Sequence, residues 1–193
     1  MIFSKEIVSL LFGRGAFSQE AISITGNALF YYSVGMIAFG LRDILSRGFY
    51  ALQDTKTPMI NATIAVVLNI VLNFILSKYL GIGGLALATS ISAMVAVGLL
   101  FISLRRKIGG FGLKELCRYF IKICLASVTM GIIALSSFEY LNVRLSQNLA
   151  LIIAIGIGVL VYGILIYFMK IPEVERTLAL VKRKLRSKAE QDE

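Results

Sequence analysis

The sequence contains no histidine and no tryptophan, and of its 193 residues only two are cysteine and two are proline. Without histidine, the Ser-His-Asp triad, histidine zinc sites and histidine haem ligation lack a required residue. Charged residues make up only 16% of the chain, against about 25% in typical soluble domains. Because 58% of the residues are hydrophobic and the mean hydropathy is +0.83, the composition excludes a soluble domain and predicts an integral membrane protein.

The two cysteines, Cys117 and Cys124, are two helical turns apart on one face, which is too far for a disulfide. Neither belongs to a CxxC motif, so we interpret both as free, small apolar fillers.

Five apolar segments are long enough to cross a bilayer, which takes about 20 residues of helix. They are residues 24–45, 58–76, 85–104, 119–138 and 149–169. A further apolar run at 7–12 is too short to span and suggests the end of an earlier helix or a re-entrant piece. The predicted fold class is therefore an all-α, polytopic transmembrane helical bundle with about five full spans and a partial N-terminal helix.

Orientation is predicted from lysine and arginine, which concentrate in cytoplasmic loops. Only Lys5, Arg14, Lys78 and Arg144 fall on one side of the predicted spans, and the other 16 of the 20 basic residues fall on the opposite side. This bias predicts an outside N-terminus and a cytoplasmic C-terminus. An outside start that carries half a helix suggests the downstream part of a longer protein, with the N-terminal portion as its partner.

The tail predicts an interfacial helix. Pro172 suits a first helical turn, acidic residues follow it, and Lys182 to Lys188 lie at the far end. An apolar stripe beside a basic face favours binding to anionic lipids on the inner leaflet. A basic nucleic-acid arm is the alternative, but the juxtamembrane position accounts for the charge without nucleic acid.

Polar and small residues recur at every fourth position in the second and third spans. The second span carries Asn61, Ala65, Asn69, Asn73 and Ser77, and the third carries Gly84, Ala88, Ser92 and Ala96, with Thr89 and Ser90 alongside. One interpretation is that these residues tie the two helices together. The other is that Asn69, Asn73 and Thr89 present oxygens to a cation or line a polar cavity.

Asp43 and Arg47 lie one helical turn apart at the inner end of the first span. They can form an interfacial ion pair that reaches water, or they can belong to a cytoplasmic gate. No motif supports catalysis: Gly81, Gly83 and Gly84 are not followed by a Walker-type GK[ST], so we expect neither an enzyme nor an ATP-driven pump.

Several longer runs carry a family resemblance. They are LLFGRGAFS at 10–18, followed by Thr25, YYSVGMIAFGLRDILSRGFYALQDTKTP at 31–58, NIVLNFIL at 69–76 and GIGGLALATSISA at 81–93. FYALQDTKTP is the most specific piece. Together these runs resemble the MurJ (MviN) family of lipid II flippases, in the multidrug/oligosaccharidyl-lipid/polysaccharide exporter superfamily, over the last third or so of a typical member.

The resemblance implies transport of the lipid-linked peptidoglycan precursor across the bacterial cytoplasmic membrane, for cell-wall synthesis, by alternating access of two lobes. Residues 1–104 would belong to the second lobe, residues 105–171 would form two peripheral helices, and residues 172–193 would form the cytoplasmic basic tail. Family members can also bind sodium. The matching positions are Asn69, Asn73, Thr89 and the carbonyl of Leu85, although the family pattern can carry aspartate where this chain has Asn73.

Two other functions remain open from the sequence. The chain could serve export of another polyprenyl-linked saccharide or of a drug, since a fold alone does not fix a substrate, although FYALQDTKTP argues against this. It could also be a membrane scaffold subunit that transports nothing, because five spans do not build two opposed lobes.

Overall fold

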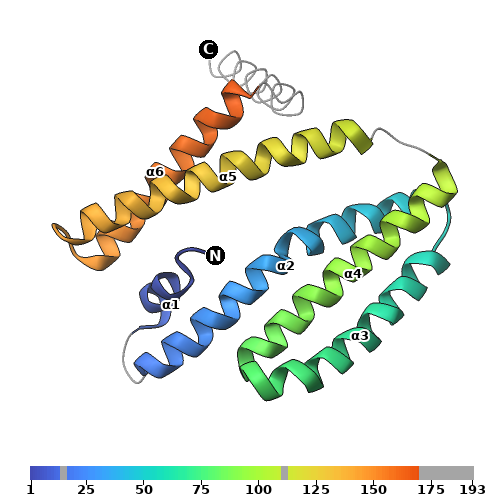
Figure 1. Cartoon of the computed structure of the whole chain (residues 1–193), viewed down its shortest axis with the longest axis horizontal. Coiled ribbons are helices and arrows are strands. Elements are labelled where there is room, and N and C mark those ends of the chain that lie inside the picture. Colours follow the sequence, from blue (N-terminus) through green and yellow to red (C-terminus); the bar gives the residue numbers. More distant parts are fainter. Residues whose placement is uncertain (14–16, 110–112, 170–193) are drawn as a thin grey trace, which may run out of the picture. The chain divides into compact units, whose positions relative to one another are not determined.

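The computed structural model describes residues 1–13, 17–109 and 113–169. These ranges form six helices and contain no strand (Figure 1). The helices are α1 (Ser4–Phe12), α2 (Gln19–Ala51), α3 (Lys56–Leu80), α4 (Ile82–Ile108), α5 (Leu113–Asn142) and α6 (Gln147–Phe168). The all-α prediction is therefore confirmed.

The last five helices are each long and apolar enough to cross a membrane, as the sequence predicted. They extend beyond the predicted apolar segments at nearly every end. Helix α2, with 33 residues, has a length of about 50 Å, well above the roughly 30 Å of a bilayer core. Its end therefore carries Arg42, Asp43 and Arg47 toward the headgroup region, because charged side chains there can reach water. The predicted tail helix lies outside the described residues.

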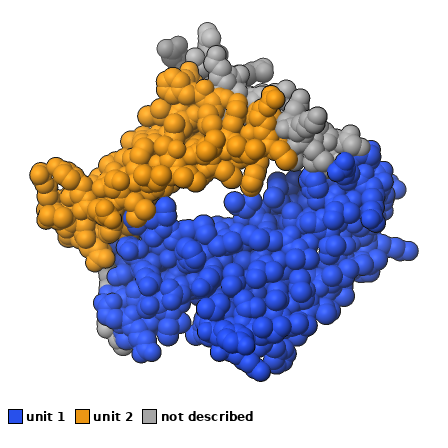
Figure 2. Space-filling view, in the orientation of Figure 1, with its two compact units in different colours: residues 1–111 blue, residues 112–193 orange. Residues whose placement is uncertain are grey.

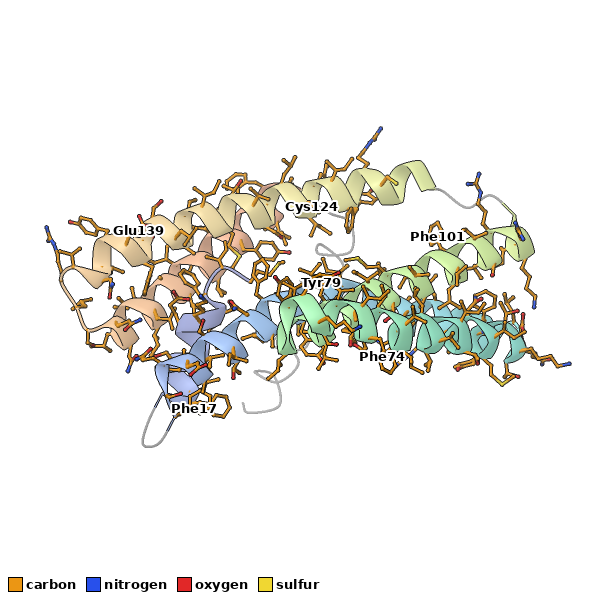
Figure 3. All side chains as sticks on the ribbon, turned by 60° about the horizontal axis from the view of Figure 1, so that its bottom comes forward. Phe17, Phe74, Tyr79, Phe101, Cys124 and Glu139 are labelled. Carbon is orange, nitrogen blue, oxygen red and sulfur yellow. The ribbon has the colours of Figure 1, made fainter. Side chains whose placement is uncertain are left out.

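The chain divides into two units, residues 1–111 and residues 112–193 (Figure 2). In unit 1, α4 packs against both α2 and α3, whereas α2 and α3 share little contact (Figure 1). Helix α3 carries large exposed side chains such as Phe74 and Tyr79, which are 72% and 83% exposed (Figure 3). Because these side chains are apolar or aromatic, this surface suits contact with lipid.

Small residues let α4 approach its neighbours closely. The predicted stripe Gly84, Ala88, Ser92 and Ala96 is buried, as are Ala86 and Ala93 on the other side of α4. A Cβ atom added at Gly35 of α2 would lie 2.8 Å from Cα of Ser90. Ser90 is fully buried, and its hydroxyl donates to the backbone carbonyl of Tyr31 at 2.7 Å. Hydrogen bonds from serine hydroxyls to a neighbouring helix help to hold membrane helices together.

The turn between α3 and α4 depends on glycine. Gly81 has a φ of 55°, a conformation that side chains other than glycine rarely adopt. At Gly84, a Cβ atom would collide with the backbone carbonyl of Leu76. The glycines at 81 and 84 therefore form a tight helical hairpin rather than a phosphate-binding loop.

Unit 2 consists of α5 and α6, which pack through small residues of both helices. Ala150, Ala154 and Gly158 of α6 are buried, as are Ala126 and Ala134 of α5. Cys117 and Cys124 are free, as predicted, but both are exposed on α5. The interpretation of both as small apolar fillers is therefore wrong, because neither side chain is buried.

Candidate functional site

The polar stripe of α3 meets the polar residues of α4 in a hydrogen-bonded cluster. The side-chain nitrogen of Asn69 donates to Thr89 Oγ1 at 3.3 Å and to Ser92 Oγ at 3.2 Å. Asn73 donates to Asn69 Oδ1 at 3.1 Å, and Thr89 donates to the backbone carbonyl of Leu85 at 2.9 Å. The structure thus brings together all four predicted sodium-site residues and also shows the predicted tie between the two helices.

The cluster leaves a polar atom without a partner. Asn73 Oδ1 is buried and accepts no hydrogen bond. Farther along α3, the side-chain nitrogen of Asn61, a residue only 7% exposed, likewise has no partner. A buried polar atom without a hydrogen bond is costly, so each of these amides has unused capacity for a ligand or a neighbouring group.

The donor set of the cluster suits a hard monovalent cation in part. Amide, hydroxyl and backbone carbonyl oxygens from Asn69, Asn73, Thr89 and Leu85 lie together, and such oxygens are the ligands that hard cations take. Asn69 Oδ1 already accepts from Asn73, so the Asn73 amide must rotate before both side-chain oxygens could contact one ion. The cluster contains no carboxylate. Its ligands would therefore not compensate the charge of a bound cation.

Asp43 and Arg47 line a cavity of about 760 Å³ inside unit 1, between α2, α3 and α4. The expected ion pair between these two residues is not formed in the described part of the chain. Instead, Asp43 lies 4.0 Å from Arg42, and both of these side chains are well exposed. The Arg42 guanidinium lies 5.9 Å from the centroid of the Phe39 ring, and Arg42 and Arg47 both line the cavity.

Beside this cavity, sequence interpretation missed an ion pair between the turn after α2 and the end of α4. Lys107 donates to Asp54 Oδ2 at 2.6 Å, and Thr57 donates to both carboxylate oxygens of Asp54 through its backbone and hydroxyl. The side chain of Asp54 is only 14% exposed, against 44% for Lys107. We call this part of unit 1, residues 51–57 with the last turn of α4, the Asp54 end.

The Lys107 ammonium and the Thr57 donors hold the pKa of Asp54 well below its usual range. Asp54 also caps α3, since its carboxylate accepts from a backbone N–H in the first turn. The only signal in the sequence was the motif FYALQDTKTP itself. Gln53, with a φ of 57°, and Asp54 show that this motif encodes a tight turn and a helix cap.

These features define a multi-pass helical membrane protein with a polar cluster between two spans and a charged cavity at one end. The family model described as "Lipid II flippase MurJ" matches residues 1–153. The chain belongs to this family.

Among curated proteins, the probable lipid II flippase MurJ of Thermotoga maritima is 36% identical over 92% of this chain and 35% of its own length. The lipid II flippase MurJ of Thermosipho africanus is 33% identical over 84% of this chain and 31% of its own. A solved structure, lipid II flippase MurJ in an inward closed conformation, matches with a TM-score of 0.73 and 34% identity over 86% of this chain and 33% of that chain. The chain thus spans about a third of the length of these relatives.

Proposed function

We propose that the chain acts as the C-terminal part of a lipid II flippase. In this role it works with upstream helices to move the lipid-linked peptidoglycan precursor across the bacterial cytoplasmic membrane. The observation that carries the proposal is the likeness to the inward closed MurJ structure over 86% of the chain. Alternating access requires two units that move against each other, and unit 1 supplies one compact body for that motion.

A complementation experiment tests this function. Expressed alone in cells depleted of their own flippase, the 193-residue chain should not restore cell shape, because one body has no counterpart to move against. Joined to the upstream two thirds of the Thermotoga maritima relative, it should restore growth and precursor export. Failure of a well-expressed fusion would contradict the flippase function and would favour a membrane scaffold subunit instead. Rescue by the chain alone would contradict its role as a part.

For the cluster of Asn69, Asn73, Leu85 and Thr89, we propose sodium binding during transport. The unpartnered Asn73 Oδ1 and the neighbouring oxygens support it. In the active fusion, Asn73→Asp should strengthen sodium dependence by adding a carboxylate, whereas Asn73→Leu should remove it. The matched control is Thr63→Val, which removes a hydroxyl that is exposed and bonded within its own helix. If transport were insensitive to sodium in both Asn73 variants, sodium binding would be excluded, and the cluster would serve only to hold α3 and α4 together.

We also propose that the Asp54 end faces the cytoplasm and that Asp43 and Arg47 form part of a gate there. The basic residues at the end of α4 support this orientation. In a variant whose native cysteines are replaced by serine, Ser103→Cys should resist an impermeant thiol reagent in intact cells, and Asn142→Cys should react. The opposite labelling pattern would overturn the orientation. The basic tail at 172–193, with its proposed binding to anionic lipids, then also lies inside.

A further inference from the structure

Helix α3 is attached unevenly to the rest of unit 1. It packs against α4 and shares little contact with α2 (Figure 1). We call residues 56–68 the first half of α3. The cavity described above separates this half from α2, with Pro58, Met59 and Ala62 of α3 in its lining. The first half of α3 is therefore held by α4 and by the contacts at the Asp54 end.

The two ends of α3 are fastened by contacts of different kinds. At the hairpin, the backbone of Gly84 lies so close to the carbonyl of Leu76 that a Cβ atom at 84 would collide with it. At the Asp54 end, Lys107 donates to Asp54 at 2.6 Å, and Thr57 donates to the same carboxylate at 3.0 and 2.7 Å. The ion pair can open by rotation of side chains, whereas the hairpin stays closed unless the turn itself changes. The hairpin is thus suited to be a hinge, and the ion pair a latch.

Asn61 makes the closed position of the first half unfavourable. It lies four and eight positions before Ala65 and Asn69, on the face of α3 from which Asn69 bonds to α4. The residue is only 7% exposed, and its side-chain nitrogen has no hydrogen-bond partner. A buried donor without an acceptor costs free energy that water would recover. Separation of α3 from α4 would therefore relieve Asn61.

We propose that the Asp54–Lys107 ion pair is a latch that keeps the first half of α3 on α4, with the hairpin as the hinge. When the latch opens, the bonds of Asn69 to α4 break by side-chain rotation, the first half of α3 swings away from α4, and water reaches Asn61. The ion pair favours the closed form and the amide of Asn61 favours the open form. This device lies within unit 1 and does not depend on the transport function proposed above.

The test measures opening in the full 193-residue chain, purified in dodecyl maltoside with both native cysteines replaced by serine. Ala65→Cys introduces one thiol at a position that is 9% exposed, on the same face of α3 as Asn61. N-ethylmaleimide at low concentration reacts at a rate that follows the population of the open form, as long as closing outpaces the reaction. Ala88→Cys is the second probe, at a fully buried position in the hairpin half of α4.

Variants of the latch should open one half of the contact only. Lys107→Gln should raise the rate at position 65 by about threefold to fivefold, the upper range for ion pairs near a surface, and leave the rate at position 88 unchanged. Lys107→Arg keeps the charge and should keep the slow rate. The matched control is Arg106→Gln, which removes the same charge from the neighbouring exposed position, where the described residues form no ion pair.

Asn61→Leu should act in the opposite direction. The side chain of Asn61 takes part in no hydrogen bond among the described residues, so the substitution removes the unpartnered amide without breaking a bond. The rate at position 65 should fall by about fivefold, the lower end of the cost of such a group. Slower reaction does not arise from misfolding, so this variant decides the matter if the latch variants fail to fold.

The outcomes separate a latch from a general loss of stability. Faster reaction at position 65 alone in Lys107→Gln, with slower reaction in Asn61→Leu, supports the latch. Equal acceleration at positions 65 and 88, an unchanged rate at 65 in Lys107→Gln, an equal effect of Arg106→Gln, or a rate that does not fall in Asn61→Leu would each overturn it. Complementation does not enter this test, so failure of the transport function would show separately.

Discussion

Replacement of Gly35 by alanine tests the close contact between α2 and α4. The added Cβ atom would lie 2.6 Å from Oγ, 2.8 Å from Cα and 2.9 Å from Cβ of Ser90. Carbon atoms in ordinary contact are about 3.5–4.0 Å apart, so the helices must separate locally by roughly 1 Å. The clash includes a backbone atom, so rotation of the Ser90 side chain does not relieve it. Overpacking of this kind costs about 1–3 kcal/mol.

The matched control is Gly40→Ala on the same helix, where an added Cβ meets nothing within 4 Å. Both substitutions gain the same helix propensity, up to about 1 kcal/mol, so the difference between them isolates the clash. We expect Gly35→Ala to be less stable than Gly40→Ala by about 1–3 kcal/mol. Unfolding by sodium dodecyl sulfate in mixed micelles, followed by circular dichroism, measures the difference. Equal stability of the two variants would refute the close packing of α2 on Ser90.

Further predictions concern other contacts. Ser90→Ala should destabilise the chain by about 0.6–1.7 kcal/mol through loss of the bond to Tyr31, whereas Ser136→Ala, an exposed hydroxyl bonded within its own helix, should have little effect in the same titration. The lowered pKa of Asp54 means that its pairing stabilises unit 1 above about pH 4 and is lost as acid protonates the carboxylate. A stability-versus-pH curve should therefore lose part of its acid limb in Asp54→Asn, and an acid limb unchanged by that substitution would count against the pair. Gly158→Leu should lower the thermal midpoint, because a Cβ at 158 already lies 3.4 Å from Ala134, while Gly156→Leu, in open space, should not; equal midpoints would argue against the α5–α6 packing.

The membrane helices could be predicted because each requires a long apolar run, which composition reveals directly. Their ends could not, because the helices continue through interfacial charge. Helix α4 extends through Arg105, Arg106 and Lys107, since basic residues favour the negative end of a helix and can reach water. Apolar length measures the thickness of the bilayer core and not the full length of the helix.

The contact between Asn69 and Thr89 was foreseeable because both helices carry polar residues at every fourth position and are joined by a short turn. The Ser90–Tyr31 and Asp54–Lys107 bonds join residues 59 and 53 positions apart. No periodicity connects such positions, because the pairing depends on which helices pack together. The pairing of Asp43 was predicted with the wrong arginine for a related reason: helical spacing identified Arg47 as a partner, but the adjacent Arg42 approaches it instead.

Neighbouring residues of α4 bind two different helices, and these two contacts differ in kind. Toward α2, Ser90 is fully buried and donates to a backbone carbonyl at 2.7 Å, beside a glycine that permits backbone contact. Toward α3, the bonds to Asn69 join side chains only, at 3.2 and 3.3 Å. Side-chain bonds can exchange partners by rotation, whereas the backbone contact requires the helices themselves to separate. Rearrangement within unit 1 should therefore begin between α3 and α4 at the Asn69 bonds, away from the backbone contact of Gly84 with Leu76 at the hairpin, while α2 and α4 move together.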